Sequence, residues 1–333
     1  MTRVLDRKAM LAIGASVLMS LMGIPRFVFP LPVLVLALRR HCRRENRIMV
    51  IVTVAVALMV DVFKVREVFF VHGGAGIAGM EVLISMIPGV AAIIWVMTAG
   101  RRMFVRFSGS CIFGVLSLMF FSLWLTGTSD GAGATREIMV EAVRQGLHAM
   151  SATLSPGASS VQDLLPAGFS VEMMVQAAGL VFMALLVPMV MLWVGFIVFL
   201  AENIARGKNP EWTAQVARWR LPQWFVWIFL VGFAVVLGSR FVTMPVAVLV
   251  AGGNTLMAAC VLYMVQGFAI LVFQVSARIP GTGVQGLFIR CGLLCLFPLV
   301  NAVVMLGLPL VGILETWIEF RKTNKEFENE NHS

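Results

Sequence analysis

The polar side chains best suited to chemistry in this chain lie inside long apolar stretches, and the richest group falls at 249–276. At 100° per residue, Gln266 and Gln274 lie within about 60° of Tyr263 on one helix face. Tyr263 is the only tyrosine in the chain. Such a stripe either packs against another helix or faces a polar cavity, and Ile270 in its middle favours packing. In a cavity, the hydroxyl and amide groups would bind a small solute.

Two asparagines complete this candidate ligand-binding set, which is Tyr263, Gln266, Asn254 and Asn301. Asn254 lies on the opposite face of an unbroken helix, and it joins the stripe only if Gly252-Gly253 interrupts that helix. Asn301 lies in a later apolar stretch. Burying such groups in hydrocarbon is costly, so they mark the positions to test first.

Four ionisable residues lie near the ends of apolar stretches, where we expect them to snorkel toward the membrane surface. They are Asp61, Glu81, Arg290 and Glu315.

The motifs of soluble enzymes are absent from the sequence or lack their context. Gly74-x-Gly76-x-x-Gly79 fits the dinucleotide fingerprint, but no acidic residue follows at the required distance, so we interpret it as a flexible connection between spans. There is no phosphate-binding P-loop and no HExxH motif, and the four histidines are scattered. Cys291 and Cys295 share a helix face, but no histidine is near, which favours core packing. We expect no enzymatic activity, no metal site and no cofactor.

The elements that position these side chains belong in lipid. Hydrophobic residues make up 59% of the 333 and charged residues 13%, whereas soluble domains contain about half and about a quarter. A spanning helix needs about 20 apolar residues. The sequence therefore predicts an all-α, polytopic transmembrane helical bundle with about 8–10 membrane segments, some short or re-entrant. The apolar segments lie near 9–23, 27–38, 48–63, 79–99, 108–126, 173–201, 222–239, 249–276, 285–305 and 308–320.

Segments 27–38 and 308–320 are short, and each has proline near its start. We interpret both as half-spans packed inside the bundle, where broken backbone is tolerated.

Positive charge alternates between the loops and sets an orientation. The formal net charge is +9. Because the arginines and lysines fall in short loops beside apolar spans, they indicate membrane topology and not nucleic-acid binding. Placing both termini in the cytoplasm puts most of them inside, in the loops 39–47, 100–107, 202–221 and 277–284 and in the tail. The predicted organisation is an N-terminal membrane half, an external loop, a C-terminal membrane half and a cytoplasmic tail, at 1–126, 127–172, 173–322 and 323–333.

Three segments are candidate interfaces. Residues 136–154 have the apolar stripe of an amphipathic helix, which would rest on the outer lipid surface or cover a cavity. Trp212 and Trp219 are seven residues apart beside arginines, which predicts an interfacial helix or a partner surface. Ala12, Ser16 and Ser20 form a ridge of small residues suited to close helix packing, within the chain or with a partner.

The C-terminal half resembles a known family. The residues that carry the resemblance are Leu221-Pro222-x-Trp224, Asn254, Tyr263-x-x-Gln266-Gly267-x-Ala269, Phe273, Leu306-Gly307 and Thr316-Trp317-Ile318-Glu319-Phe320-Arg321-Lys322. They are similar to the YybS-like family of uncharacterised bacterial integral membrane proteins. That family is distantly similar in fold to the substrate-binding subunits of energy-coupling-factor transporters. The resemblance implies a multi-pass protein of the bacterial cytoplasmic (inner) membrane.

Two functions follow as hypotheses. The first is a small-solute binding or transport-type membrane subunit, with its cavity along the Tyr263 stripe. The alternative is a membrane scaffold without transport activity, which binds membrane or cytoplasmic protein partners through the Trp212 and Trp219 surface. A void beside the stripe would favour the first, and a packed helix there would count against it.

Overall fold

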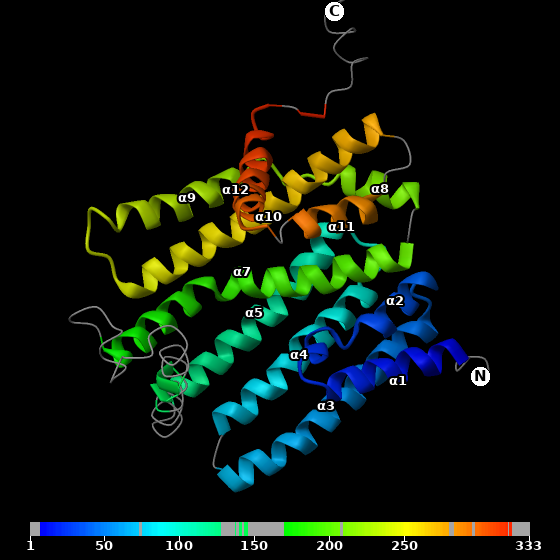
Figure 1. Cartoon of the computed structure of the whole chain (residues 1–333), viewed down its shortest axis with the longest axis vertical. Coiled ribbons are helices and arrows are strands. Elements are labelled where there is room, and N and C mark those ends of the chain that lie inside the picture. Colours follow the sequence, from blue (N-terminus) through cyan, green and yellow to red (C-terminus); the bar gives the residue numbers. More distant parts are fainter. Residues whose placement is uncertain are drawn as a thin grey trace, which may run out of the picture. The chain divides into compact units, whose positions relative to one another are not determined.

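The computed structural model describes residues 7–72, 75–127, 137, 140–141, 143–145, 170–206, 209–279, 283–294, 297–318 and 320–321 (Figure 1). Within these ranges the chain forms helices and turns and no strand, which confirms the all-α prediction. Most of the predicted amphipathic helix at 136–154 and the tail 323–333 lie outside the described residues.

Helices rich in valine, leucine, isoleucine and phenylalanine make up two compact units, Met1–Leu186 and Val187–Ser333, which divide within α7 (Val171–Arg206). Five described helices are long and apolar enough to cross a membrane, as the bundle prediction requires. Many of their outward side chains are large and apolar, such as Phe120 and Met59. A helix that is apolar all round suits lipid contact. The four-part organisation predicted from the loops stays a prediction, because residues 128–136 and 146–169 are not described.

The first unit contains a broken helix packed against long spans. Its elements are α1 (Arg7–Leu21), the 3-10 helix η1 (Ile24–Val28), α2 (Leu31–Arg39), α3 (Arg44–His72), α4 (Ala75–Met97) and α5 (Met103–Gly127). Neighbouring helices pack in sequence, α3 on α4 and α4 on α5, while α1, η1 and α2 pack against α3 and α4. Pro25, at the start of η1, lacks an N–H and so favours the break between α1 and α2.

The glycine-rich connection predicted between the third and fourth spans is mostly helix. The long α3 continues to His72, and α4 already begins at Ala75, so that Gly76 and Gly79 are helical. The prediction was wrong there because glycine lowers helix propensity by only about 1 kcal/mol, which packing in a long apolar helix outweighs. A Cβ on Gly79 would lie 2.6 Å from the ring of Phe121 in α5, so this glycine is a packing position.

The second unit is organised around α10 (Val246–Arg278). Both α9 (Phe225–Gly238) and α12 (Pro298–Leu314) pack on it, and α8 (Pro210–Ala217) contacts both α10 and α11 (Val284–Leu294). Figure 1 shows α9 and α10 running antiparallel, with α12 crossing α10. At the α9–α10 contact, a Cβ on Gly232 would lie 2.7 Å from the backbone N of Leu256, so only glycine allows this separation.

The last two predicted segments are divided at a different place. We predicted 285–305 and 308–320, whereas α12 runs without a break from Pro298 to Leu314. The break comes before Pro298, which suits the first turn of a helix because its missing N–H would have no partner there. Pro309 lies inside α12 and not near the start of a helix.

Candidate functional site

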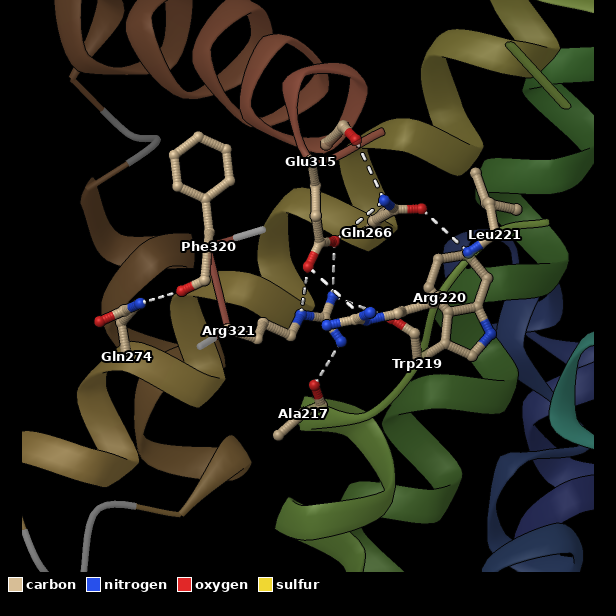
Figure 2. Close-up of polar contacts among 10 residues, drawn as sticks. Ala217, Trp219, Arg220, Leu221, Gln266, Gln274, Glu315, Phe320 and Arg321 are labelled. Atoms are coloured by element: carbon tan, nitrogen blue, oxygen red, sulfur yellow. Dashed lines mark hydrogen bonds and ion pairs between the residues drawn. The ribbon is translucent and has the colours of Figure 1, made fainter. Parts of the chain in front are cut away.

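The predicted polar stripe of α10 is saturated by contacts within the second unit. Gln266 is buried, and its Oε1 accepts from the Leu221 N–H at 2.9 Å. Its Nε2 donates to the Gly312 carbonyl at 3.1 Å and to Oε2 of Glu315 at 3.0 Å. Figure 2 shows this amide between the loop at Leu221 and the end of α12. The side chain expected to bind a solute therefore joins three segments of the chain.

Glu315 and Arg321 form the charged part of the same cluster (Figure 2). Arg321 Nη2 donates to Glu315 Oε2 at 3.0 Å, which is a charge-assisted hydrogen bond. Arg321 Nε lies 2.7 Å from Glu315 Oε1 in an ion pair that lacks hydrogen-bond geometry. The Arg321 side chain is 4% exposed and that of Glu315 is 3% exposed. Arg321 also donates to the backbone carbonyls of Ala217 at 2.6 Å and Trp219 at 3.0 Å. Arg220 lies 3.8 Å from the same carboxylate but is half exposed.

Burial lowers the pKa of the Arg321 guanidinium, the neighbouring Glu315 carboxylate raises it, and the charge of Arg220 lowers it. The pair therefore offsets part of the cost of burying each charge. We expected Glu315 to snorkel toward the membrane surface, but its carboxylate is buried because Arg321 and Gln266 provide its partners inside the protein.

The α10–α12 crossing leaves no space at the centre of the stripe. A Cβ on Gly267 would collide with the Leu308 carbonyl, and a Cβ on Gly312 would collide with the Tyr263 carbonyl. Two backbones that approach this closely exclude a solute between them. Tyr263 is 1% exposed. The stripe therefore faces a packed helix, as Ile270 in its middle favoured.

The rest of the Tyr263 side chain is also enclosed. Its ring lies 5.9 Å from that of Phe225 and 6.1 Å from that of Phe229, both at edge-to-face angles. The Thr316 side chain lies beside the Tyr263 hydroxyl. Farther along α10, Gln274 Nε2 donates to the Phe320 carbonyl at 2.6 Å, so the whole stripe holds the segment that follows α12.

The two asparagines of the predicted ligand set lie elsewhere. Helix α10 is unbroken at Gly252-Gly253, so Asn254 does not join the stripe. Its Oδ1 accepts from the Val187 N–H at 2.9 Å, next to Pro188 inside α7. Side chains often satisfy the backbone groups that a proline disturbs in a membrane helix. Asn301, in α12, is half-buried, and its Oδ1 is buried with no hydrogen-bond partner.

The predicted interface residues are mostly committed to internal contacts. Trp212 is buried, its Nε1 donates to Asn203 Oδ1 at 2.9 Å, and the Arg206 guanidinium lies over its ring. Trp219 is half-buried.

The small-residue ridge of α1 packs within the first unit. Ser16 and Ser20 are buried and Ala12 is half-buried. Ser16 Oγ accepts from the Val33 N–H in α2 at 3.3 Å. Ser16 is therefore engaged within the first unit, and a role of the ridge as an interface stays a prediction.

A second polar cluster lies in the first unit, at residues that looked isolated in the sequence. Arg26, in η1, reaches two spans: its Nη2 lies 3.1 Å from Oδ1 of Asp61 in α3, and its Nη1 lies 3.4 Å from Oε2 of Glu81 in α4. It also donates through Nε to Ser85 Oγ at 2.8 Å and through Nη2 to the Glu81 carbonyl at 2.7 Å. Asp61 is fully buried and does not snorkel.

Nothing in the sequence paired Arg26 with Asp61 or Glu81, because the three residues are far apart along the chain. One signal was present: an acidic residue within an apolar span needs a cation nearby. Arg26 lies between two short apolar segments and beside Pro25, where a broken helix can carry a side chain into the bundle.

Among known proteins, the family model described as "Predicted membrane protein (DUF2232)" matches residues 9–309. The chain belongs to this family. The family description and the long apolar helices together establish a multi-pass membrane protein. No curated protein and no solved structure matches the chain.

Proposed function

We propose that this membrane protein is a small-solute binding or transport-type subunit, and that its site is the Arg26–Asp61–Glu81 cluster. The observation that carries the proposal is an arginine in a broken helix that is held by carboxylates from two apolar helices. Charged groups inside membrane segments usually mark the path of a solute or an ion. Broken helices commonly form the binding sites of secondary transporters.

The second unit supports moving the site away from the Tyr263 stripe. The Gln266 amide is satisfied by protein groups at both its oxygen and its nitrogen, and backbone contacts at Gly267 and Gly312 close the crossing. A solute there would have to break several bonds between buried groups, each costly to leave unmade. The YybS-like resemblance and its distant similarity to transporter substrate-binding subunits point to the same class of function by fold analogy alone.

The proposal is tested by ligand-dependent stability. Purified full-length protein in detergent is screened for a rise in melting temperature with small cationic, anionic and zwitterionic solutes. A solute at about 100 times its Kd stabilises the folded state by about 2.7 kcal/mol. We expect at least one solute to stabilise the wild type and not Arg26→Gln.

Arg144→Gln is the matched control, because Arg144 forms an exposed pair with Glu141, and it should respond as the wild type does. Gln266→Ala should also retain the response, with a lower starting stability. No stabilisation by any class of solute, or stabilisation that persists in Arg26→Gln, would overturn the proposal.

A second candidate is a membrane scaffold that binds a protein partner at the loop 218–221. Arg321 fixes this loop through the carbonyls of Ala217 and Trp219, while Arg218 and Arg220 remain exposed beside the half-buried Trp219. A fixed loop that presents two arginines and an indole suits an acidic protein surface.

A photo-crosslinker at position 219 tests this candidate in whole cells. We expect it to capture one protein, and the yield should fall in Arg220→Ala. The same probe at Glu211, exposed on the neighbouring α8, is the control for chance collisions. If position 219 captures no protein, or only what position 211 captures, the scaffold function is excluded.

A further inference from the structure

We propose that Asp61 is a proton-binding site inside the membrane, which exchanges between a carboxylate paired with Arg26 and a neutral carboxylic acid. Only the role of this proton as the coupling ion for solute movement rests on the proposed function. The proton comes from water, forms an O–H bond at Oδ2 of Asp61, and returns to water on release.

The first argument is the charge of the cluster. One guanidinium, on Arg26, faces two carboxylates, on Asp61 and Glu81. Lys64, one turn along α3 from Asp61, donates to the Leu21 carbonyl at 3.3 Å. Arg66 and Glu67, which also follow Asp61 in α3, are adjacent in the sequence and opposite in charge. The remaining charged residues of α1, α2 and α3 lie toward the other ends of their helices: Arg7 and Lys8 in α1, Arg39 in α2, and Arg44, Glu45 and Arg47 in α3. Among the three side chains in direct contact, one cation therefore faces two carboxylates, and a proton on Asp61 would balance their charge.

The second argument is the state of the Asp61 oxygens. The residue is fully buried, and neither Oδ1 nor Oδ2 has a hydrogen-bond partner. Oδ1 lies 3.1 Å from Arg26 Nη2, but the pair lacks hydrogen-bond geometry. An ionised carboxylate offers about four acceptor positions and is costly to bury with so few filled. Protonation at Oδ2 removes that charge.

The third argument is that Arg26 stays in place when Asp61 is neutral. Its Nε remains bonded to Ser85 Oγ, and its Nη2 to the Glu81 carbonyl. The Glu81 carboxylate remains as its counterion. Protonation therefore makes Asp61 neutral and leaves Arg26 paired with the Glu81 carboxylate. No buried charge is left without a partner of opposite charge.

One side of the cluster is also exposed at the protein surface. The Glu81 side chain is 40% exposed, that of Arg26 is 14% exposed, and that of Asp61 is 0% exposed. Glu81 is the most exposed of the three side chains, so we expect a proton to reach Asp61 past it.

Infrared difference spectroscopy on the full-length protein in lipid vesicles tests the proposal. The C=O stretching band of a protonated carboxyl group is followed as a function of pH, over the range in which the protein stays folded. We expect a band that grows as the pH falls and is missing from Asp61→Asn. Glu141→Gln, which removes an exposed carboxylate, should keep this band.

Two further variants make the test independent of how well Asp61→Asn folds. Glu81→Gln removes a neighbouring negative charge, so the Asp61 band should appear only at lower pH. Arg26→Gln removes the positive charge, so it should appear already at higher pH. Each shift should be on the order of one pH unit, or tenfold in proton affinity.

The proposal is overturned if the wild type has no pH-dependent band that Asp61→Asn lacks, or if the two charge variants move the band in the same direction. The titration requires no solute, so its failure leaves the proposed solute site standing. A solute screen without a hit leaves the proton site standing.

Discussion

Two arginines face the Glu315 carboxylate, and removing each should have very different consequences for stability. The Arg321 side chain is 4% exposed, whereas that of Arg220 is 51% exposed and lies 3.8 Å away. Arg321→Ala leaves a buried carboxylate with the Gln266 amide and a distant cation, and breaking a buried pair in this way costs about 3–5 kcal/mol. Arg220→Ala breaks a solvent-screened contact, worth about 0–1 kcal/mol.

The double variant Glu315→Leu/Arg321→Leu separates the ion pair from the packing that surrounds it. A buried pair replaced by apolar side chains of similar volume is often neutral in stability, although Gln266 then loses one acceptor at about 1 kcal/mol. We expect the double variant to be more stable than Arg321→Ala. The measurement is the free energy of unfolding in detergent micelles, followed by tryptophan fluorescence. Equal losses for Arg321→Ala and Arg220→Ala would refute the assignment of Arg321 as the buried partner.

Three further predictions concern other parts of the chain. Gly312→Ala should destabilise the protein by several kcal/mol because its Cβ would collide with a backbone carbonyl of α10. Gly307→Ala, which has open space on the same helix, should stabilise the protein by up to about 1 kcal/mol. Equal melting temperatures of the two variants would contradict the close α10–α12 crossing. Asn254→Ala should lower the free energy of unfolding by about 1–3 kcal/mol, because it removes the acceptor of a backbone N–H beside the proline of α7. Thr255→Ala is the control, because this exposed hydroxyl donates only to its own helix. It should change the free energy of unfolding by less than about 0.5 kcal/mol. Reporter fusions at the two termini should both be active on the cytoplasmic side, as the distribution of positive charge predicts, and opposite signals would refute that orientation.

Most of the fold could be predicted from the sequence because lipid imposes a simple requirement. A spanning helix must hide its backbone polar groups and present apolar side chains, and that pattern is visible along one stretch of chain. The predictions were wrong where a few glycines or prolines alone were used to place a break between helices. Gly76 and Gly79 were interpreted as a loop although a long helix includes them, and the break before Pro298 was placed about ten residues too late.

The candidate site was only partly predictable because its partners are far apart in the sequence. The helical period correctly grouped Tyr263, Gln266 and Gln274 on one face of α10. It gave no information about the backbone that would lie against Gly267. Gln266 bonds to residues 45, 46 and 49 positions away, and no pattern in the chain specifies such distances.

By itself, the sequence determined that the protein lies in a membrane, that it is helical, and which polar side chains its apolar stretches contain. Only the tertiary structure decided what those side chains do. A carboxylate in an apolar span must find a partner because an unpaired buried charge is too costly, but which partner depends on how the helices cross. In the second unit the crossing closed the stripe at Tyr263 with backbone atoms. In the first unit, helix packing brought Arg26 between Asp61 and Glu81, where neither oxygen of Asp61 has a hydrogen-bond partner.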